Sequence, residues 1–206
     1  MMLNNSGFDL WADEYDKSVE ISDEENLYPF AGYRNVMNCI FGEIMKKSAA
    51  SVLDVGFGTA TLAKKLYDYG YEIFGQDFSR RMIEIANEKM PRAHLYEGDC
   101  SKGICSELLK QKYDFIVSTY ALHHLDDAQK EEIINCFLSL LNNEGKILIG
   151  DVAFENRDEL EKCKSDCKDE WDDDEIYFVF DEIKKIFPKI IFEKMSYCSG
   201  VLMLCK

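Results

Sequence analysis

The sequence predicts a doubly wound α/β domain, and three observations carry that prediction. From Ser51 onward, short apolar runs alternate with longer segments of helical periodicity, the pattern of parallel strands joined by helices. A glycine-rich turn, with Gly56 and Gly58, follows the first of these runs. The last two apolar runs are separated by a short segment containing Ser199 and Gly200, which allows a hairpin but not a parallel crossover.

Length and composition are those of one ordinary globular domain, with 206 residues, of which 47% are hydrophobic and 31% charged. The formal net charge of −15 repels phosphate backbones and anionic lipids, so we expect a small-molecule partner and neither nucleic acid nor membrane. Residues 1–13 lack the basic and apolar regions of a signal peptide, and no apolar run reaches the ~18 residues of a transmembrane helix. We therefore expect a cytoplasmic protein and, without an extended heptad seam, a monomer or a weak homodimer.

The chain is expected to form a single domain, 1–206, in which an N-terminal helical cap over 1–50 precedes an α/β core over 51–206. In the cap, apolar residues recur with helical spacing in 8–19 and again in 31–47. Neither segment is required by a parallel sheet, so we expect the cap to act as a lid.

Five apolar runs of the core are expected to be parallel strands. Several of them lack a polar alternate face, which fits strands that helices cover on both sides. The last two runs should form an antiparallel hairpin at or near one edge. The strands are expected at 51–55, 71–75, 93–96, 114–118, 146–150, 190–192 and 201–204, and the core helices at 61–69, 81–89, 106–110 and 129–141.

Residues that can bind a ligand follow the ends of the predicted strands. Asp54 precedes the glycine turn of Gly56 and Gly58, Asp77 ends the second strand and Asp99 follows the third. Glycine suits positions where the backbone passes close to a ligand, and an acid about twenty residues further on can accept both hydroxyls of a ribose. Ligands of open α/β sheets bind outside the carboxyl ends of the strands. The pattern therefore predicts a nucleoside-binding crevice, although Asp54 can equally hold the turn through backbone hydrogen bonds.

No metal site is expected. Cys163 and Cys167 would share one helix face, but two further ligands at zinc spacing are lacking in the sequence nearby. The acidic run 169–175 is able to attract a divalent cation, but it lacks the turn glycine of a hard-metal loop, so a solvated face is the favoured interpretation.

His123 and His124 follow the fourth strand, where an imidazole can accept a proton near neutral pH. Adjacent residues of a helix point about 100° apart, so both cannot face the crevice. We expect one of them to cap or pack the following helix, and no catalytic base is assigned.

Several motifs, in this order, are similar to those of class I S-adenosylmethionine-dependent methyltransferases. They read DVGFGTA from Asp54, GQDFS from Gly75, EGDC from Glu97, YDFIVSTYALHHL from Tyr113, and LLNNEGKILIGD up to Asp151. The resemblance is strongest to small bacterial members that share VSTYAxHHL, an AFEN stretch, here 153–156, and an FxxWAxxYD opening, here 8–16. It covers nearly the whole chain.

This resemblance implies a Rossmann-like sheet of seven strands in the order 3-2-1-4-5-7-6, with strand 7 antiparallel. It implies S-adenosylmethionine as the cofactor and a methyl acceptor as the partner. At the nucleoside end, Asp77 would hold the ribose hydroxyls and Asp99 the adenine amino group, with the backbone amide of Cys100 beside the ring and Phe78 on its face.

At the methionine end, the resemblance implies that Gly56 and Gly58 approach the cofactor, that Thr119 lies near it and that Tyr15 closes over it. Asp54 is counted with these cofactor-binding residues. The family often has a third glycine where this chain has Ala60, and an alanine is tolerated there if its φ is negative.

The aromatic residues outside the sheet suggest a small, partly apolar acceptor, and several can stabilise a sulfonium charge. These residues are Trp11, Tyr15, Tyr28, Phe30, Tyr33, Tyr120 and Trp171. Two alternatives remain open. A nicotinamide-dependent oxidoreductase would want glycine or alanine where the chain has Thr61. A protein that binds S-adenosylmethionine without catalysis would keep the same motifs.

Overall fold

The computed structural model of the chain describes residues 26–206. The helix expected at 8–19, with Trp11 and Tyr15, lies outside these described residues.

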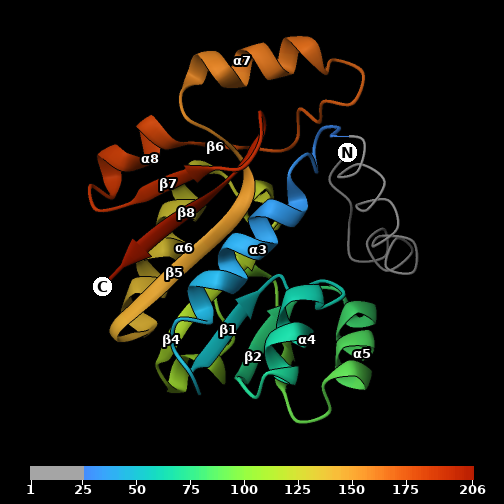
Figure 1. The fold of residues 1–206 in the computed structure, drawn as a ribbon, viewed down its shortest axis with the longest axis vertical. Helices are drawn as coiled ribbons and strands as arrows, with labels where there is room; N and C mark the ends of the chain where they lie inside the picture. The colour runs from blue at the N-terminus through green and yellow to red at the C-terminus, as the bar shows by residue number, and fades with distance from the viewer. Residues whose placement is uncertain (1–25) are drawn as a thin grey trace.

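A single twisted sheet organises the described chain (Figure 1), and its main path runs in the order β3-β2-β1-β4-β5-β8-β7. β8 is antiparallel to both of its neighbours, while the other pairs along this path are parallel. The predicted order 3-2-1-4-5-7-6 is therefore confirmed, with β7 and β8 as its sixth and seventh strands. The strands are β1 (Ser51–Val55), β2 (Glu72–Asp77), β3 (His94–Glu97), β4 (Tyr113–Thr119), β5 (Leu141–Phe154), β7 (Ile191–Lys194) and β8 (Ser199–Cys205).

The structure differs from the prediction around β5, which extends well beyond the expected 146–150 in both directions. Its last residues, Ala153 and Phe154, pair in parallel with a two-residue strand, β6 (Phe178–Val179). So short a strand shows no periodicity of its own, because it is defined by its partner. The expected helix at 106–110 is a 3₁₀ turn, η2 (Leu108–Lys110), since one turn is too short for a stable α-helix.

Helices cover both faces of the sheet (Figure 1), as the apolar strands require. One core contains buried residues of α3, α4 and α5, and the other contains those of α6 and α8. Ser79 caps α5 as expected, with its hydroxyl oxygen accepting from the Met82 amide at 3.2 Å. The helices are α3 (Tyr33–Ile44), α4 (Thr61–Asp68), α5 (Arg80–Lys89), α6 (Asp127–Leu140), α7 (Arg157–Asp166) and α8 (Phe180–Ile186).

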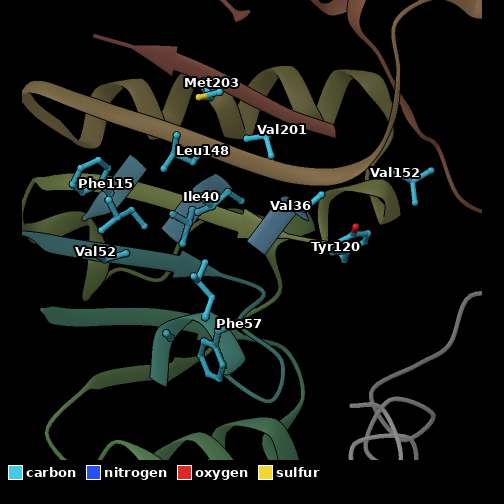
Figure 2. Close-up of a cluster of buried hydrophobic side chains, with 14 of the residues drawn as sticks. Val36, Ile40, Val52, Phe57, Phe115, Tyr120, Leu148, Val152, Val201 and Met203 are labelled. Atoms are coloured by element: carbon cyan, nitrogen blue, oxygen red, sulfur yellow. The ribbon is translucent and has the colours of Figure 1, made fainter. Parts of the chain in front are cut away.

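The second helix expected in the cap, 31–47, is α3, and it is part of the core rather than only a lid. Val36, Ile40 and Ile44 lie on one face of α3 and are fully buried against the sheet (Figure 2). Gly150 of β5 permits this close approach, because a Cβ there would lie 2.3 Å from Val36 Cγ1. The helix therefore seats directly on the strands that lead to the predicted crevice.

Shortening Ile40 to alanine should lower the free energy of unfolding by about 2–5 kcal/mol, because the change leaves a cavity in a fully buried position. Asn38→Ala on the exposed side of the same helix is the matched control, with an expected change within about 0.5 kcal/mol. Urea denaturation of both variants measures the difference. Equal stabilities would show that α3 is not packed as described.

Among residues 26–206, no helix combines the length and the apolar character that crossing a bilayer requires.

Candidate ligand-binding site

A cavity of about 270 Å³ opens at the carboxyl ends of the parallel strands, where a ligand of an open α/β sheet is expected. Eight of the nine predicted cofactor-binding residues line it, although they come from four different strand ends. Tyr15, the ninth, lies outside the described residues. The eight are Asp54, Gly56, Gly58, Asp77, Phe78, Asp99, Cys100 and Thr119.

The glycine turn between β1 and α4 needs its first glycine for two reasons. Gly56 has φ +76°, and a Cβ there would lie 2.5 Å from Ala121 Cβ, so a side chain has no room. Gly58 has φ +52°, but a Cβ there would meet no atom within 4 Å. Ala60 has φ +63°, so the negative φ under which an alanine is tolerated is not met and this alanine adopts the left-handed conformation itself. The turn therefore carries a strain of roughly 1–2 kcal/mol at Ala60.

Asp77 ties the end of β2 to this turn. Its buried carboxylate accepts a hydrogen bond from the Gly58 amide at 2.9 Å and another from the Ser79 amide at 2.9 Å. A charge at this place is stabilised by backbone donors and lies on the cavity wall. Asp77 thus shapes the turn and presents a carboxylate to a ligand at once.

Asp99 lies at the rim of the cavity and is only partly buried. Its carboxylate accepts from the Ser101 amide at 3.0 Å and pairs with Lys102 at 2.9 Å. Burial raises the pKa of Asp99, but these partners outweigh it and hold the pKa below its ordinary value. The side chain of Gln76, in β2, fixes the loop that follows Asp99. It donates to the Gly103 carbonyl at 3.0 Å and accepts from the Cys105 amide at 2.8 Å. The sequence analysis missed Gln76, although it stands directly before the predicted Asp77.

Asp54 is buried on the cavity wall, and its Oδ1 atom has no hydrogen-bond partner among the described residues. Desolvation, and then the nearby charge of Asp77, raise the pKa of Asp54 to about 8. No hydrogen bond of Asp54 to the turn is present there, so the turn-holding alternative lacks support. A buried carboxyl oxygen without a donor favours a ligand that supplies one.

The raised pKa of Asp54 predicts how stability depends on pH. Between about pH 4 and pH 8, the carboxyl group of Asp54 is protonated in the folded chain and ionised in the unfolded chain. The free energy of unfolding should therefore fall across this window as pH rises. Asp54→Asn removes the titration, and the variant should be more stable than the parent by at least about 1 kcal/mol at pH 9 and equal to it at pH 4.

Asp114 is the control of opposite sign for this experiment. Although burial raises the pKa of Asp114, hydrogen bonds from Lys47, Ser51 and Asn142 outweigh it and lower the pKa to about 2. Asp114→Asn should therefore destabilise the protein at neutral pH, with a loss that shrinks below about pH 4. If thermal unfolding of Asp54→Asn shows the pH profile of the parent, the burial of a proton at Asp54 is refuted.

Only some of the aromatic side chains outside the sheet line the cavity. Tyr33 and Tyr120 line the cavity, and their rings lie 5.3 Å apart. Tyr28 and Trp171 do not line it: they stack on each other at 5.4 Å and pack against Tyr177. Tyr28 and Trp171 instead hold the segment after α7 to the chain before α3.

His123 is held by a buried carboxylate of β5. Its Nδ1 atom donates to Asp151 at 2.6 Å, and Asp151 also accepts from the amides of Leu122 and Val152 at 3.2 and 2.8 Å. Burial lowers the pKa of His123, but Asp151 outweighs it and the pKa is raised. The motif ILIGD contains Asp151, but a single acid gives no signal of a partner in another loop.

His124 lines the cavity and the buried His123 does not, as expected for adjacent residues that cannot both face the crevice. Neither histidine caps the following helix α6, whose N-cap is Asp126. They belong to a 3₁₀ turn, η3 (Leu122–His124), rather than to the following helix. Burial, and then the neighbouring His123, lower the pKa of His124 to about 4.

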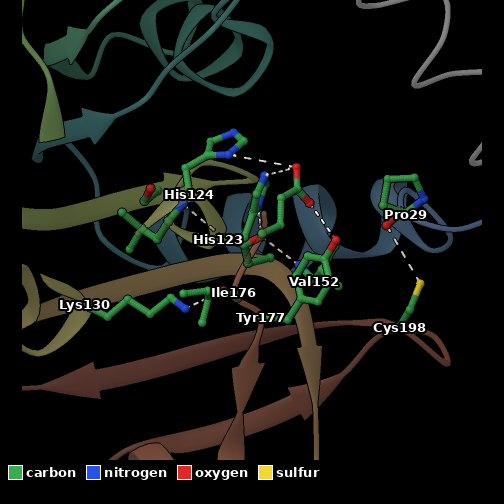
Figure 3. Close-up of polar contacts among 12 residues, drawn as sticks. Pro29, His123, His124, Lys130, Val152, Ile176, Tyr177 and Cys198 are labelled. Carbon is green, nitrogen blue, oxygen red and sulfur yellow. Dashed lines mark hydrogen bonds and ion pairs between the residues drawn. The ribbon is translucent and has the colours of Figure 1, made fainter. Parts of the chain in front are cut away.

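The end of the acidic run also reaches the site, which corrects its interpretation as a wholly solvated face. Asp172, Asp174 and Glu175 line the cavity. Glu175 lies close to both histidines and accepts a hydrogen bond from the Tyr177 hydroxyl at 2.6 Å (Figure 3). This segment follows α7 and has no regular structure, so its periodicity could not reveal which side it buries.

Comparison with known proteins adds the following. Residues 52–145 match the model of a methyltransferase domain family. The chain is 38% identical over 161 residues to an "uncharacterized methyltransferase" from Anoxybacillus flavithermus, which covers 78% of this chain and 73% of that protein. It is 31% identical over 180 residues to another protein of that description from Alkaliphilus oremlandii, covering 87% and 80%.

Among solved structures, the fold is similar to that of magnesium protoporphyrin IX methyltransferase from Synechocystis, crystallised with bound S-adenosylhomocysteine (SAH). The TM-score is 0.68 at 17% identity, and the match covers 86% of this chain and 84% of that one. A likeness at this identity concerns the fold.

Proposed function

The chain belongs to the methyltransferase domain family, and on that premise we propose that it transfers a methyl group from S-adenosylmethionine to a small-molecule acceptor. The observation that carries the proposal is the convergence of eight cofactor-binding candidates on one cavity at the carboxyl edge of the sheet. Solved structures of the same fold contain S-adenosylmethionine or SAH.

The residues present fit this cofactor. The cavity is near the lower end of the ~300–1,000 Å³ of small-molecule clefts. Asp54 offers a buried oxygen without a donor, and S-adenosylmethionine carries a cationic ammonium group that can donate to it. Space over Gly58 is open, so a ligand can approach the backbone of the turn.

In this proposal Asp77 holds the ribose hydroxyls, and Asp99 the adenine amino group. Phe78 and the Cys100 amide lie against the adenine ring. At the other end, the turn of Gly56 and Gly58, with Asp54 and Thr119, holds the methionine portion. Asp77 and Asp99 come from neighbouring strand ends, so one rigid sheet edge sets the distance between their contacts.

S-adenosylmethionine, when bound, supplies an electrophilic methyl group on a sulfonium. The contribution of the chain is then orientation and exclusion of water, which can supply about 7–11 kcal/mol of the barrier reduction. Tyr33 and Tyr120 offer aromatic faces to positive charge from one wall of the cavity. We assign no catalytic base.

A small acceptor is supported by the net charge of the chain and by the partly apolar wall of the cavity. The net charge of −15 opposes a nucleic-acid substrate, and the wall near Tyr33 and Met37 is partly apolar. The structural neighbour from Synechocystis is named for a small-molecule acceptor. We further propose a single cytoplasmic domain, monomeric or weakly dimeric, which size-exclusion chromatography with light scattering tests.

Activity is tested with S-adenosylmethionine that carries a labelled methyl group, incubated with the protein and a bacterial extract. The extract is first separated into low-molecular-weight, protein and nucleic-acid fractions. We expect SAH to form and the label to enter the low-molecular-weight fraction only. Label in protein or RNA would contradict the acceptor class, and SAH binding without any turnover would favour a binding protein without catalysis.

A further inference from the structure

Three side chains of types that bind metal ions, His123, His124 and Glu175, lie together beside the cavity, and the proposed function uses none of them. His123 Nε2 lies 3.6 Å from Glu175 Oε1, and His124 Nδ1 lies 3.9 Å from the same oxygen. The three atoms lie within 4.8 Å of one another, and no second group of this kind occurs in residues 26–206. Figure 3 shows His123 and His124 with dashed contacts to one shared carboxylate.

These distances suit a shared ion better than direct hydrogen bonds. At 3.6 and 3.9 Å the nitrogen and oxygen atoms are beyond the ~2.7–3.2 Å of an N–H···O bond. Ligand atoms about 2.0–2.2 Å from a tetrahedral ion lie about 3.3 Å from one another. The two nitrogen–oxygen distances therefore need to contract by only a few tenths of an ångström, and the two histidine nitrogens, which lie within 4.8 Å of each other, by up to about 1.5 Å.

Two of the three candidate ligands have the supporting partners that metal ligands usually have. The Nδ1–H group of His123 donates to Asp151 at 2.6 Å, which leaves Nε2 with its lone pair toward Glu175. The second carboxylate oxygen of Glu175 accepts from Tyr177 at 2.6 Å, and Tyr177 is hydrogen-bonded to Tyr28. A carboxylate behind a histidine fixes its tautomer and ring orientation.

The backbone also fixes Glu175 relative to the histidines. The amide of Ile176 donates to the His123 carbonyl at 2.8 Å, and the Ile176 carbonyl accepts from the buried amino group of Lys130 (Figure 3). The segment after α7 is thus tied to η3 and to α6 next to the cluster. Such preorganisation lowers the conformational entropy that is lost when the three side chains are brought together around an ion.

We propose that His123, His124 and Glu175 bind one divalent transition-metal ion, with Zn²⁺ as the reference ion. Two imidazoles and one carboxylate form the ligand class of open zinc sites, which keep a further position for another ligand. The charge of the ion would offset the carboxylates of Glu175 and Asp151, which lie on either side of His123.

His124 and Glu175 line the ligand cavity, while His123 lies behind them. The open position of the metal site therefore faces the cavity. A role there in holding a nitrogen or oxygen atom of the acceptor rests on the proposed function. Binding of the ion itself does not depend on it. β1 and its glycine turn separate the metal ligands, which follow β4 and β5, from Asp77 and Asp99.

The test uses the full chain after dialysis against a chelator, with Co²⁺ followed by its visible absorption and Zn²⁺ added to displace it. We expect one Co²⁺ per chain with the intense bands of tetrahedral coordination. Loss of a residue that hydrogen-bonds a metal ligand costs ~10–100-fold in metal affinity, so Tyr177→Phe should lose about tenfold and the ligand variants Glu175→Gln and His124→Gln at least about 100-fold.

Asp173→Asn is the matched control, because Asp173 belongs to the same acidic run but pairs with Lys164 outside the cluster. It should bind Co²⁺ like the parent chain. Equal binding by the parent and Glu175→Gln, or equal losses in Glu175→Gln and Asp173→Asn, would overturn the proposal in favour of loose association with surface acids. Thermal unfolding of the same samples shows that each variant is folded, and SAH affinity is measured in parallel. SAH binding without Co²⁺ binding refutes the metal site alone, and the reverse refutes the proposed function alone.

Discussion

Replacing Asp77 by alanine is expected to weaken the binding of SAH by at least about 100-fold, or about 2.7 kcal/mol. Hydrogen bonds to a charged group contribute ~1.5–3 kcal/mol each, and the carboxylate is assigned two ribose hydroxyls. The variant also loses the acceptor of the Gly58 and Ser79 amides, so the turn itself is weakened. Calorimetric titration with SAH measures the effect, and thermal unfolding reports whether the fold persists.

Two further variants separate the ribose contact from the support of the turn. Asp77→Asn keeps an oxygen acceptor for one amide and should lose less affinity than the alanine variant. Asp99→Ala should lose only about tenfold, because the partly exposed Asp99 is assigned one contact and already pairs with Lys102. An Asp77→Ala protein that binds SAH within about threefold of the parent (~0.7 kcal/mol) would remove Asp77 from the site.

Gly56→Ala should destabilise the protein by about 2–5 kcal/mol, the second large effect we expect. A left-handed conformation costs a residue with a side chain ~1–2 kcal/mol, and forcing a methyl group into packed structure costs a further ~1–3 kcal/mol. Both terms apply, because Gly56 has φ +76° and its added Cβ would lie 2.5 Å from Ala121 Cβ. SAH binding should be lost with the shape of the turn.

Gly58→Ala is the matched comparison within the same turn. With φ +52° and no atom within 4 Å of its added Cβ, this variant should lose only about 1 kcal/mol of stability. Its methyl group would occupy space that the ligand needs, so SAH affinity should still fall. Chemical denaturation and calorimetry together give the two quantities, and equal destabilisation of the two variants would contradict the described turn.

The parallel core was predictable because its signals are local. Runs such as Phe115-Ile116-Val117 are apolar on both faces, and the few residues between the last two runs allow only an antiparallel return. The signals of the glycine turn, of Asp77 at the end of β2 and of Asp99 just after β3 are equally local. The switch-point argument therefore placed the two glycines and the three acids at one edge, whereas Phe78, Cys100 and Thr119 came from the family resemblance alone.

What the sequence did not reveal depends on contacts between distant segments. Glu175 meets His123 only because Ile176 and Lys130 fold the segment after α7 against η3. β6 exists only as a partner of the end of β5. At Ala60, a negative φ was the condition for tolerating an alanine, but the β1–α4 connection has φ +63° there. Tertiary structure decided each of these cases over local preference.

The most direct test of the central claim is a calorimetric titration of the parent protein with SAH, with NAD as the control ligand. We expect micromolar binding of one SAH per chain and no measurable binding of NAD. Absence of SAH binding, or tighter binding of NAD, would contradict the assignment of this cavity to S-adenosylmethionine.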